Sequence, residues 1–180
     1  MPTHAHGHAR GRRALLGRGA RLALLAGAAG VAPGCGFRLR GTSDMQFETL
    51  HSGFAASSAL GEEFRREFLR STSSRLVASP EDAQVRLIVL GEVRERDIVA
   101  YSAVGRPREY QLRLRLQFRA TDGADQEFIP PSEIILRRDI SAADNQLTAR
   151  VDEEALLYRD MQRDMVQQLM RRLAAIRMTP

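Results

Sequence analysis

The most regular pattern in the chain is an alternation of apolar and polar residues from Tyr110 to Ala120. A repeat of two residues predicts a β-strand with one face in the core and the other in water. The apolar face carries Tyr110, Leu112, Leu114, Leu116, Phe118 and Ala120, and the polar face carries Gln111, Arg113, Arg115, Gln117 and Arg119. The segment therefore predicts a long strand that is buried on one side only.

Three further strands are expected around this one. They lie at 45–50, at 85–101 with a β-branched start, and at 133–140 after a break at Pro130-Pro131. The turn signal Gly105-Arg106-Pro107 separates the 85–101 strand from the alternating strand, so these two are expected to pair antiparallel.

Two segments have helical spacing instead. Leu60, Phe64 and Phe68 recur every four residues, with Ser57-Ser58 as an N-cap before them and a Ser/Thr cluster at 71–74 as the expected end. A second helix is expected to begin near Asp152, because the acidic residues Glu153 and Glu154 favour the positive end of a helix dipole. One stripe of that helix carries Tyr158, Met161, Met165, Leu169, Leu173 and Ile176. The preceding residues, 141–151, are interpreted as a loop.

These elements follow the order βαβββα. The pattern predicts an α+β fold, a two-layer sandwich in which two helices pack on one face of a four-stranded, mostly antiparallel sheet. The other sheet face would carry Arg113, Arg115 and Arg119. That face is either an ordinary solvated surface or a surface that meets a partner.

The charge of the chain is concentrated at its beginning. There are 27 basic and 22 acidic residues, a net charge of +5, and every basic residue is arginine. Residues 1–34 contain five arginines and no acidic residue, which accounts for the whole excess. The remainder is balanced, so the sequence argues against a nucleic-acid-binding protein.

The N-terminal segment has the features of an export signal. An arginine-rich stretch precedes a short apolar run, 22–31, which is too short to span a bilayer as a helix. Small residues then lead to Cys35, the only cysteine, as in a bacterial lipoprotein box. The next residue, Gly36, resembles the residue found there in lipoproteins that are sent to the outer membrane. We expect a signal peptide at 1–34, a lipid on Cys35 and a single domain at 35–180. The alternative is an ordinary signal peptide that leaves a free thiol. Arg12-Arg13 also resembles a twin-arginine export motif, so the export route stays open.

No catalytic or metal-binding pattern is found in the predicted mature chain. Its only histidine is His51, which would lie in a loop after the first strand. There is no glycine-rich phosphate loop and no cluster of ligands at metal spacing. We expect neither an enzyme nor a protein that holds a metal or cofactor.

Several segments together resemble one family. Residues 35–41 (CGFRLRG), Glu109-Tyr110-Gln111 at the start of the alternating strand, and segments 157–161 and 168–173 of the last helix are similar to LptE, the lipopolysaccharide-assembly lipoprotein of Gram-negative outer membranes. The similarity covers most of residues 35–177. It implies a two-layer sandwich that plugs the β-barrel LptD, helps it assemble and binds lipopolysaccharide without catalysis. It also implies a lipid-anchored protein at the periplasmic face of the outer membrane and in the barrel lumen.

The resemblance also suggests ligand contacts. Basic residues near the hairpin turn and before the last helix are tied to lipopolysaccharide binding in the family, and arginine binds phosphate bidentately. Arg150 matches the second position, whereas Ala103 occupies the first, with Arg106 and Arg108 close enough to substitute. Each of these arginines is equally well explained as a solvated surface residue. The alternative function is a free-standing periplasm-facing lipoprotein that binds an amphiphile or scaffolds an envelope complex.

Overall fold

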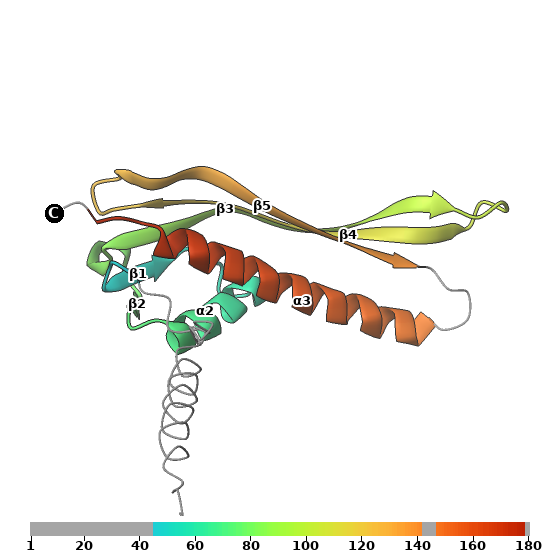
Figure 1. Ribbon diagram of the computed structural model, residues 1–180, viewed down its shortest axis with the longest axis horizontal. Coiled ribbons are helices and arrows are strands. Elements are labelled where there is room, and N and C mark those ends of the chain that lie inside the picture. The colour runs from blue at the N-terminus through green and yellow to red at the C-terminus, as the bar shows by residue number, and fades with distance from the viewer. Residues whose placement is uncertain (1–44, 142–146, 179–180) are drawn as a thin grey trace, which may run out of the picture. The chain divides into compact units, whose positions relative to one another are not determined.

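The computed structural model describes residues 45–141 and 147–178 (Figure 1). Cys35 and the predicted signal peptide lie outside the described residues. The described residues form one sheet with helices packed on one of its faces. The elements follow in the order β1, α2, β2, a short 3₁₀ helix at Pro80–Asp82, β3, β4, β5 and α3.

The sheet has five strands in the spatial order β2-β1-β3-β4-β5. Their bounds are Thr49–Ser52 for β1, Arg75–Val77 for β2, Val85–Tyr101 for β3, Pro107–Thr121 for β4 and Glu127–Ser141 for β5. β1 runs parallel to both β2 and β3, whereas β3, β4 and β5 pair antiparallel. The α+β sandwich with a mostly antiparallel sheet is therefore confirmed.

The fifth strand, β2, was not expected, because three residues are too few to show a periodicity. Hydrogen bonds to residues far away in the sequence, which no local sequence pattern reveals, hold it at the edge of the sheet. The Arg75 amide donates to the Glu48 carbonyl at 2.8 Å, and the Ser74 hydroxyl donates to the Phe47 carbonyl at 2.6 Å.

β5 begins earlier than the sequence predicts and includes Pro130-Pro131. Proline lacks an amide donor, which is tolerated where a strand lies at the edge of a sheet. The register shifts at this point, since Phe118 pairs with Ser132 but Ala120 pairs with Ile129. The two prolines thus bulge out of the ladder instead of ending the strand.

The first helix, α2 (Ala59–Ser71), has the predicted limits. The Ser58 hydroxyl oxygen accepts a hydrogen bond from the Gly61 amide at 2.8 Å, and the helix is capped at its end by Thr72. The second helix, α3 (Leu147–Ala174), begins five residues before the expected start at Asp152. No glycine or proline lies in 147–151, so nothing prevents the helix from starting earlier. Glu153 and Glu154 therefore lie inside the helix and not at its beginning. Arg150 therefore lies in the first turn of α3 and not in a loop before it.

The core lies between the sheet and the two helices. Leu60, Phe64 and Phe68 of α2 are fully buried, as are the inward residues of β4 from Leu112 to Ala120. The residues of the predicted helical stripe are all buried (Tyr158, Met161, Met165, Leu169, Leu173 and Ile176), although α3 ends at Ala174 and Ile176 lies just beyond it. The faces assigned from periodicity are confirmed, apart from Tyr110, which is half-buried.

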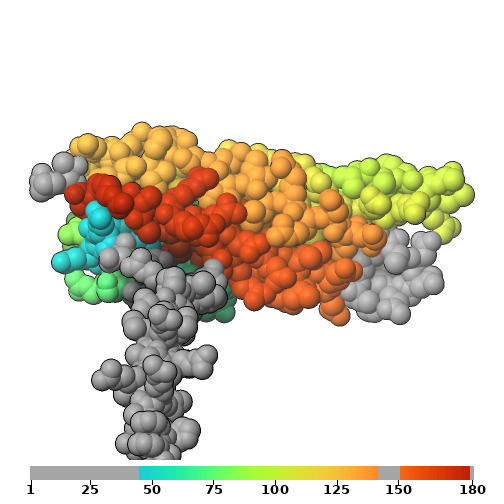
Figure 2. Space-filling view, viewed as in Figure 1, coloured from blue at the N-terminus to red at the C-terminus, as the bar shows by residue number. Residues whose placement is uncertain are grey.

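The helices cover the sheet unequally. α3 runs under the long strands, whereas α2 lies near the end that carries β1 and β2 (Figure 1). β1 pairs with β3 only as far as Leu87, so the rest of the β3 edge has no strand beside it among the described residues. The β3–β4 hairpin, yellow-green in Figure 2, projects beyond the described part of α3.

Candidate ligand and partner surfaces

The tip of the β3–β4 hairpin carries two of the predicted ligand residues. Gly105 adopts a positive φ of 75°, which suits glycine, and the turn is closed by the Ser102 amide donating to the Arg106 carbonyl at 2.7 Å. Arg106 follows in the turn and Arg108 is the second residue of β4, and both are exposed. Within the described part of the chain, neither guanidinium forms an ion pair or hydrogen bond.

Apolar side chains surround these arginines. Val104 is 79% exposed and Tyr101 is 61% exposed, and Ile98 and Val99 are also exposed further down β3. Large exposed apolar residues gathered beside free cations form an amphipathic surface, which suits a ligand with both acyl and anionic groups.

The two other predicted site residues, Arg150 and Cys35, cannot be placed beside the hairpin arginines. The backbone of Arg150 lies in α3, but its side chain is outside what the structure describes. Cys35 is outside the described residues altogether. The structure therefore brings Arg106 and Arg108 together and leaves both other residues as predictions.

The arginines on the outer face of β4 have carboxylate partners. Arg113 contacts Glu95 at 3.1 Å and Asp97 at 3.0 Å, both from β3. Arg115 lies 3.5 Å from Glu95 and 3.8 Å from Glu133 of β5. Arg119 similarly lies 3.6 Å from Glu127. This face is thus a polar surface with compensated charge instead of an open cationic patch.

A second group of arginines lies on the inner face of β3, where the sequence patterns did not indicate a site. Arg94 and Arg96 pair with the buried Leu114 and Leu112 of β4, so they point toward the helix layer. Arg96 contacts Glu154 of α3 at 2.9 Å, and Arg94 lies 4.0 Å from the same carboxylate. In the sequence, these arginines belong to a run of mixed charge at 92–97. The run indicates a site only once the strand register shows which residues face α3.

Tyr158 of α3 joins the helix to this strand. Its hydroxyl donates to the Glu95 carbonyl at 2.6 Å, and the Arg94 guanidinium lies over its ring, 3.5 Å from the centroid. Burial raises the pKa of the Tyr158 hydroxyl, an effect that the nearby Arg94 opposes. The neutral hydroxyl is therefore the form that the folded protein favours.

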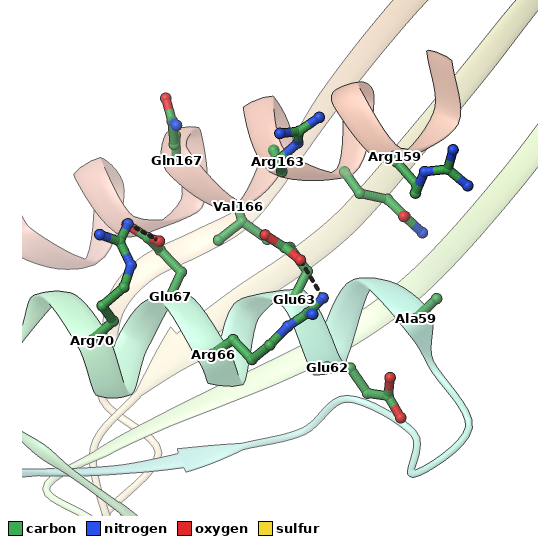
Figure 3. Close-up of a pocket in the computed structure, with 11 residues that line it drawn as sticks. Ala59, Glu62, Glu63, Arg66, Glu67, Arg70, Arg159, Arg163, Val166 and Gln167 are labelled. Atoms are coloured by element: carbon green, nitrogen blue, oxygen red, sulfur yellow. Dashed lines mark hydrogen bonds and ion pairs between the residues drawn. The ribbon is translucent and has the colours of Figure 1, made fainter. Parts of the chain in front are cut away.

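A groove of about 770 Å³ separates α2 from α3 (Figure 3). Its α2 wall carries the i,i+3 ion pairs Glu63–Arg66 and Glu67–Arg70, and Arg159 and Arg163 lie on the α3 side. Because Arg66 and Arg70, the two α2 arginines that line the groove, are each paired with a carboxylate, the groove does not present a strong net charge. Between 45–141 and 147–178, no group of His, Cys, Asp or Glu is placed to hold a metal ion. In the same part of the chain, no helix is both long and apolar enough to cross a membrane.

Comparison with known proteins identifies the family. The family model described as lipopolysaccharide-assembly, LptE, matches residues 47–173. This chain belongs to the LptE family. The LPS-assembly lipoprotein LptE of Pectobacterium atrosepticum is 30% identical over 152 residues, which cover 81% of this chain and 80% of that protein.

Solved structures agree with this membership. The solution NMR structure of lipoprotein B from Nitrosomonas europaea is 33% identical and superposes with a TM-score of 0.68, covering 78% of this chain and 91% of that one. The crystal structure of the rare lipoprotein B from Shewanella oneidensis is 20% identical, with a TM-score of 0.59 and coverage of 71% and 94%, and shows the same fold. The LptE resemblance of the sequence is thus confirmed, and with it a role in lipopolysaccharide assembly.

Proposed function

We propose that this LptE-family chain is a non-enzymatic outer-membrane lipoprotein that forms a complex with the β-barrel LptD and binds lipopolysaccharide during its insertion into the outer leaflet. The observation that carries the proposal is the family match over 47–173, which spans nearly all described elements. In this proposal residues 1–34 are the signal peptide, and 35–180 form one domain anchored by a lipid on Cys35, with its surface in the barrel lumen and periplasm.

The outer sheet face supports contact with a barrel. The interior wall of a large membrane β-barrel is polar. On this face Arg113 and Arg115 form ion pairs with Glu95 and Glu133. The face therefore offers hydrogen-bond donors and acceptors, while its positive and negative charges balance. Such a face can lie against a polar wall with little electrostatic repulsion.

The hairpin tip supports contact with the ligand. Arg106 and Arg108 carry guanidinium groups without a carboxylate partner in the described part of the chain, beside the exposed Tyr101 and Val104. Lipopolysaccharide presents phosphates next to acyl chains, and guanidinium groups bind phosphate bidentately. Arg150 is proposed as the third contact, from the first turn of α3.

Co-purification tests the complex. A tagged copy of the chain, extracted from its own cells in mild detergent, is expected to bring down a large outer-membrane β-barrel in stoichiometric amount. Recovery of the lipoprotein alone would overturn the complex and favour a free-standing, amphiphile-binding lipoprotein.

The anchor and the ligand contacts have separate tests. Labelled fatty acid is expected to enter the wild-type protein and not Cys35→Ala, and label that survives the substitution would contradict the anchor. Arg150→Glu and Arg106→Glu are expected to weaken lipopolysaccharide binding without unfolding the domain. Arg66→Glu, in the groove between the helices, is the matched control and is expected to bind like wild type.

A further inference from the structure

We propose that Arg94 and Arg96 form an additional binding site, which takes a phosphate group of the lipopolysaccharide through the inner face of β3. This site rests on the proposed function, because it assumes that the chain binds lipopolysaccharide. It is separate from the hairpin tip, since both residues point toward α3, several residues before the turn.

The carboxylate groups near Arg94 and Arg96 do not neutralise the positive charge of both guanidinium groups. The Glu154 carboxylate contacts Arg96 at 2.9 Å and Arg94 only at 4.0 Å, so among the described side chains one negative charge faces two guanidinium groups. The next carboxylate on this face, Glu92, accepts a hydrogen bond from the Ser58 hydroxyl at 2.6 Å, at the start of α2. A guanidinium group has five N–H donors, so most donors of the pair remain available to an anion.

Aromatic rings hold the guanidinium planes in place. Arg94 lies 3.5 Å from the centroid of the Tyr158 ring. Tyr158 is only 3% exposed, and its hydroxyl donates to the β3 backbone. Arg96 lies 5.0 Å from the centroid of Tyr110. Stacked arginines lose less conformational freedom when they bind, which favours a preformed site.

The pair is also accessible. The side chains of Arg94 and Arg96 are 54% and 52% exposed, whereas Glu154 is 21% exposed. β3 has no strand beside it beyond Leu87 in the described chain, so a ligand can approach from the open edge. Ile98 follows Arg96 on the same face and is partly exposed, leading toward the apolar tip.

This arrangement matches the order of groups in an acylated phosphosugar. A phosphate on the arginine pair would place neighbouring acyl chains along Ile98 and toward Val104. Glu154 would compete with the phosphate for Arg96, because both anions use the same N–H donors. The Glu154 carboxylate is therefore predicted to weaken ligand binding, while the Tyr158 and Tyr110 rings keep the arginines in place.

The competition allows a test that a purely structural cluster would not pass. Binding of purified lipopolysaccharide is measured for the full chain as wild type, Arg94→Gln/Arg96→Gln and Glu154→Gln, with Arg119→Gln on the outer face as the control. The double variant is expected to bind about tenfold more weakly, as for the loss of a charged hydrogen-bonded contact. Glu154→Gln is expected to bind more tightly than wild type, and Arg119→Gln to bind equally.

A second ligand separates phosphate binding from general weakening. Lipopolysaccharide from which the lipid A phosphates have been removed is expected to bind wild type and the double variant equally. If the double variant lost the same affinity for dephosphorylated lipopolysaccharide as for intact lipopolysaccharide, the phosphate site would be overturned. Wild-type affinity in the double variant, or weaker binding by Glu154→Gln, would likewise overturn it while leaving the proposed function intact. No binding by wild type would overturn the proposed function itself.

Discussion

Replacing Tyr158 with phenylalanine removes one hydroxyl from the contact between α3 and β3 and leaves the ring in place. The lost interaction is the hydrogen bond to the Glu95 carbonyl at 2.6 Å, while the stacking of Arg94 on the ring at 3.5 Å is retained. A hydrogen bond of this kind contributes about 0.5–1.5 kcal/mol net, so we expect the free energy of unfolding to fall by about 1 kcal/mol.

The assay is urea denaturation at pH 8 followed by circular dichroism. Tyr158→Phe is expected to lower the midpoint without changing the slope, because the surface buried in the fold hardly changes. Tyr101→Phe is the matched control, since Tyr101 is largely exposed at the hairpin and its hydroxyl has no partner in the described chain. It is expected to unfold like wild type.

The same pair of proteins tests the pKa. Burial raises the pKa of the Tyr158 hydroxyl above its ordinary value of 10.0, so the unfolded chain releases this proton at a lower pH than the folded protein does. The stabilisation is complete below pH 10 and is lost as the pH rises through the folded pKa. The stability difference between wild type and Tyr158→Phe should therefore shrink above pH 10.

Two results would contradict the role of the Tyr158 hydroxyl. One is equal stability of wild type and Tyr158→Phe at pH 8, which would mean that the hydroxyl contributes nothing to holding α3 on β3. The other is a stability difference that stays constant up to pH 11, which would contradict the raised pKa.

Two further predictions concern the packing of α2. Ser58→Ala removes the N-cap and the contact with Glu92, and it is expected to lower the free energy of unfolding by about 1 kcal/mol in thermal or urea unfolding. Ser57→Ala should have little effect, and equal effects of the two substitutions would contradict the capping role of Ser58. Phe64→Ala leaves a cavity in the core and is expected to lower the free energy of unfolding by about 3–5 kcal/mol, against a small change for the exposed Leu69→Ala, and a loss below about 1 kcal/mol would show that Phe64 is not the core residue described.

Most of the fold follows from burial periodicity. β4 and α3 are long enough for a repeat of two, or of three and four, to stand out, so their buried faces are predicted correctly from Leu112 to Ala120 and from Tyr158 to Ile176. The failures have a different cause. β2 has three residues, and the prolines at 130–131 are compatible with a strand only because β5 lies at the sheet edge, which depends on topology.

The surfaces are harder to predict because they depend on strand register. The sequence leaves the face of Arg113 and Arg115 open as a solvated surface or a partner surface, and only the pairing of β4 with β3 and β5 shows that Glu95 and Glu133 compensate their charge. In contrast, Arg94 and Arg96 look like part of a mixed-charge run. Their shared carboxylate, Glu154, lies 58 residues from Arg96 along the chain, so no local pattern reveals the pair.

The central claim is that this LptE-family chain acts in lipopolysaccharide assembly, and depletion of the protein in its own cells tests it most directly. Lipopolysaccharide on intact cells is labelled from outside and compared with the total before and after depletion. We expect that surface lipopolysaccharide falls while newly made lipopolysaccharide accumulates inside, and that re-expression of the wild-type protein restores the surface level. Unchanged surface lipopolysaccharide after depletion would contradict it.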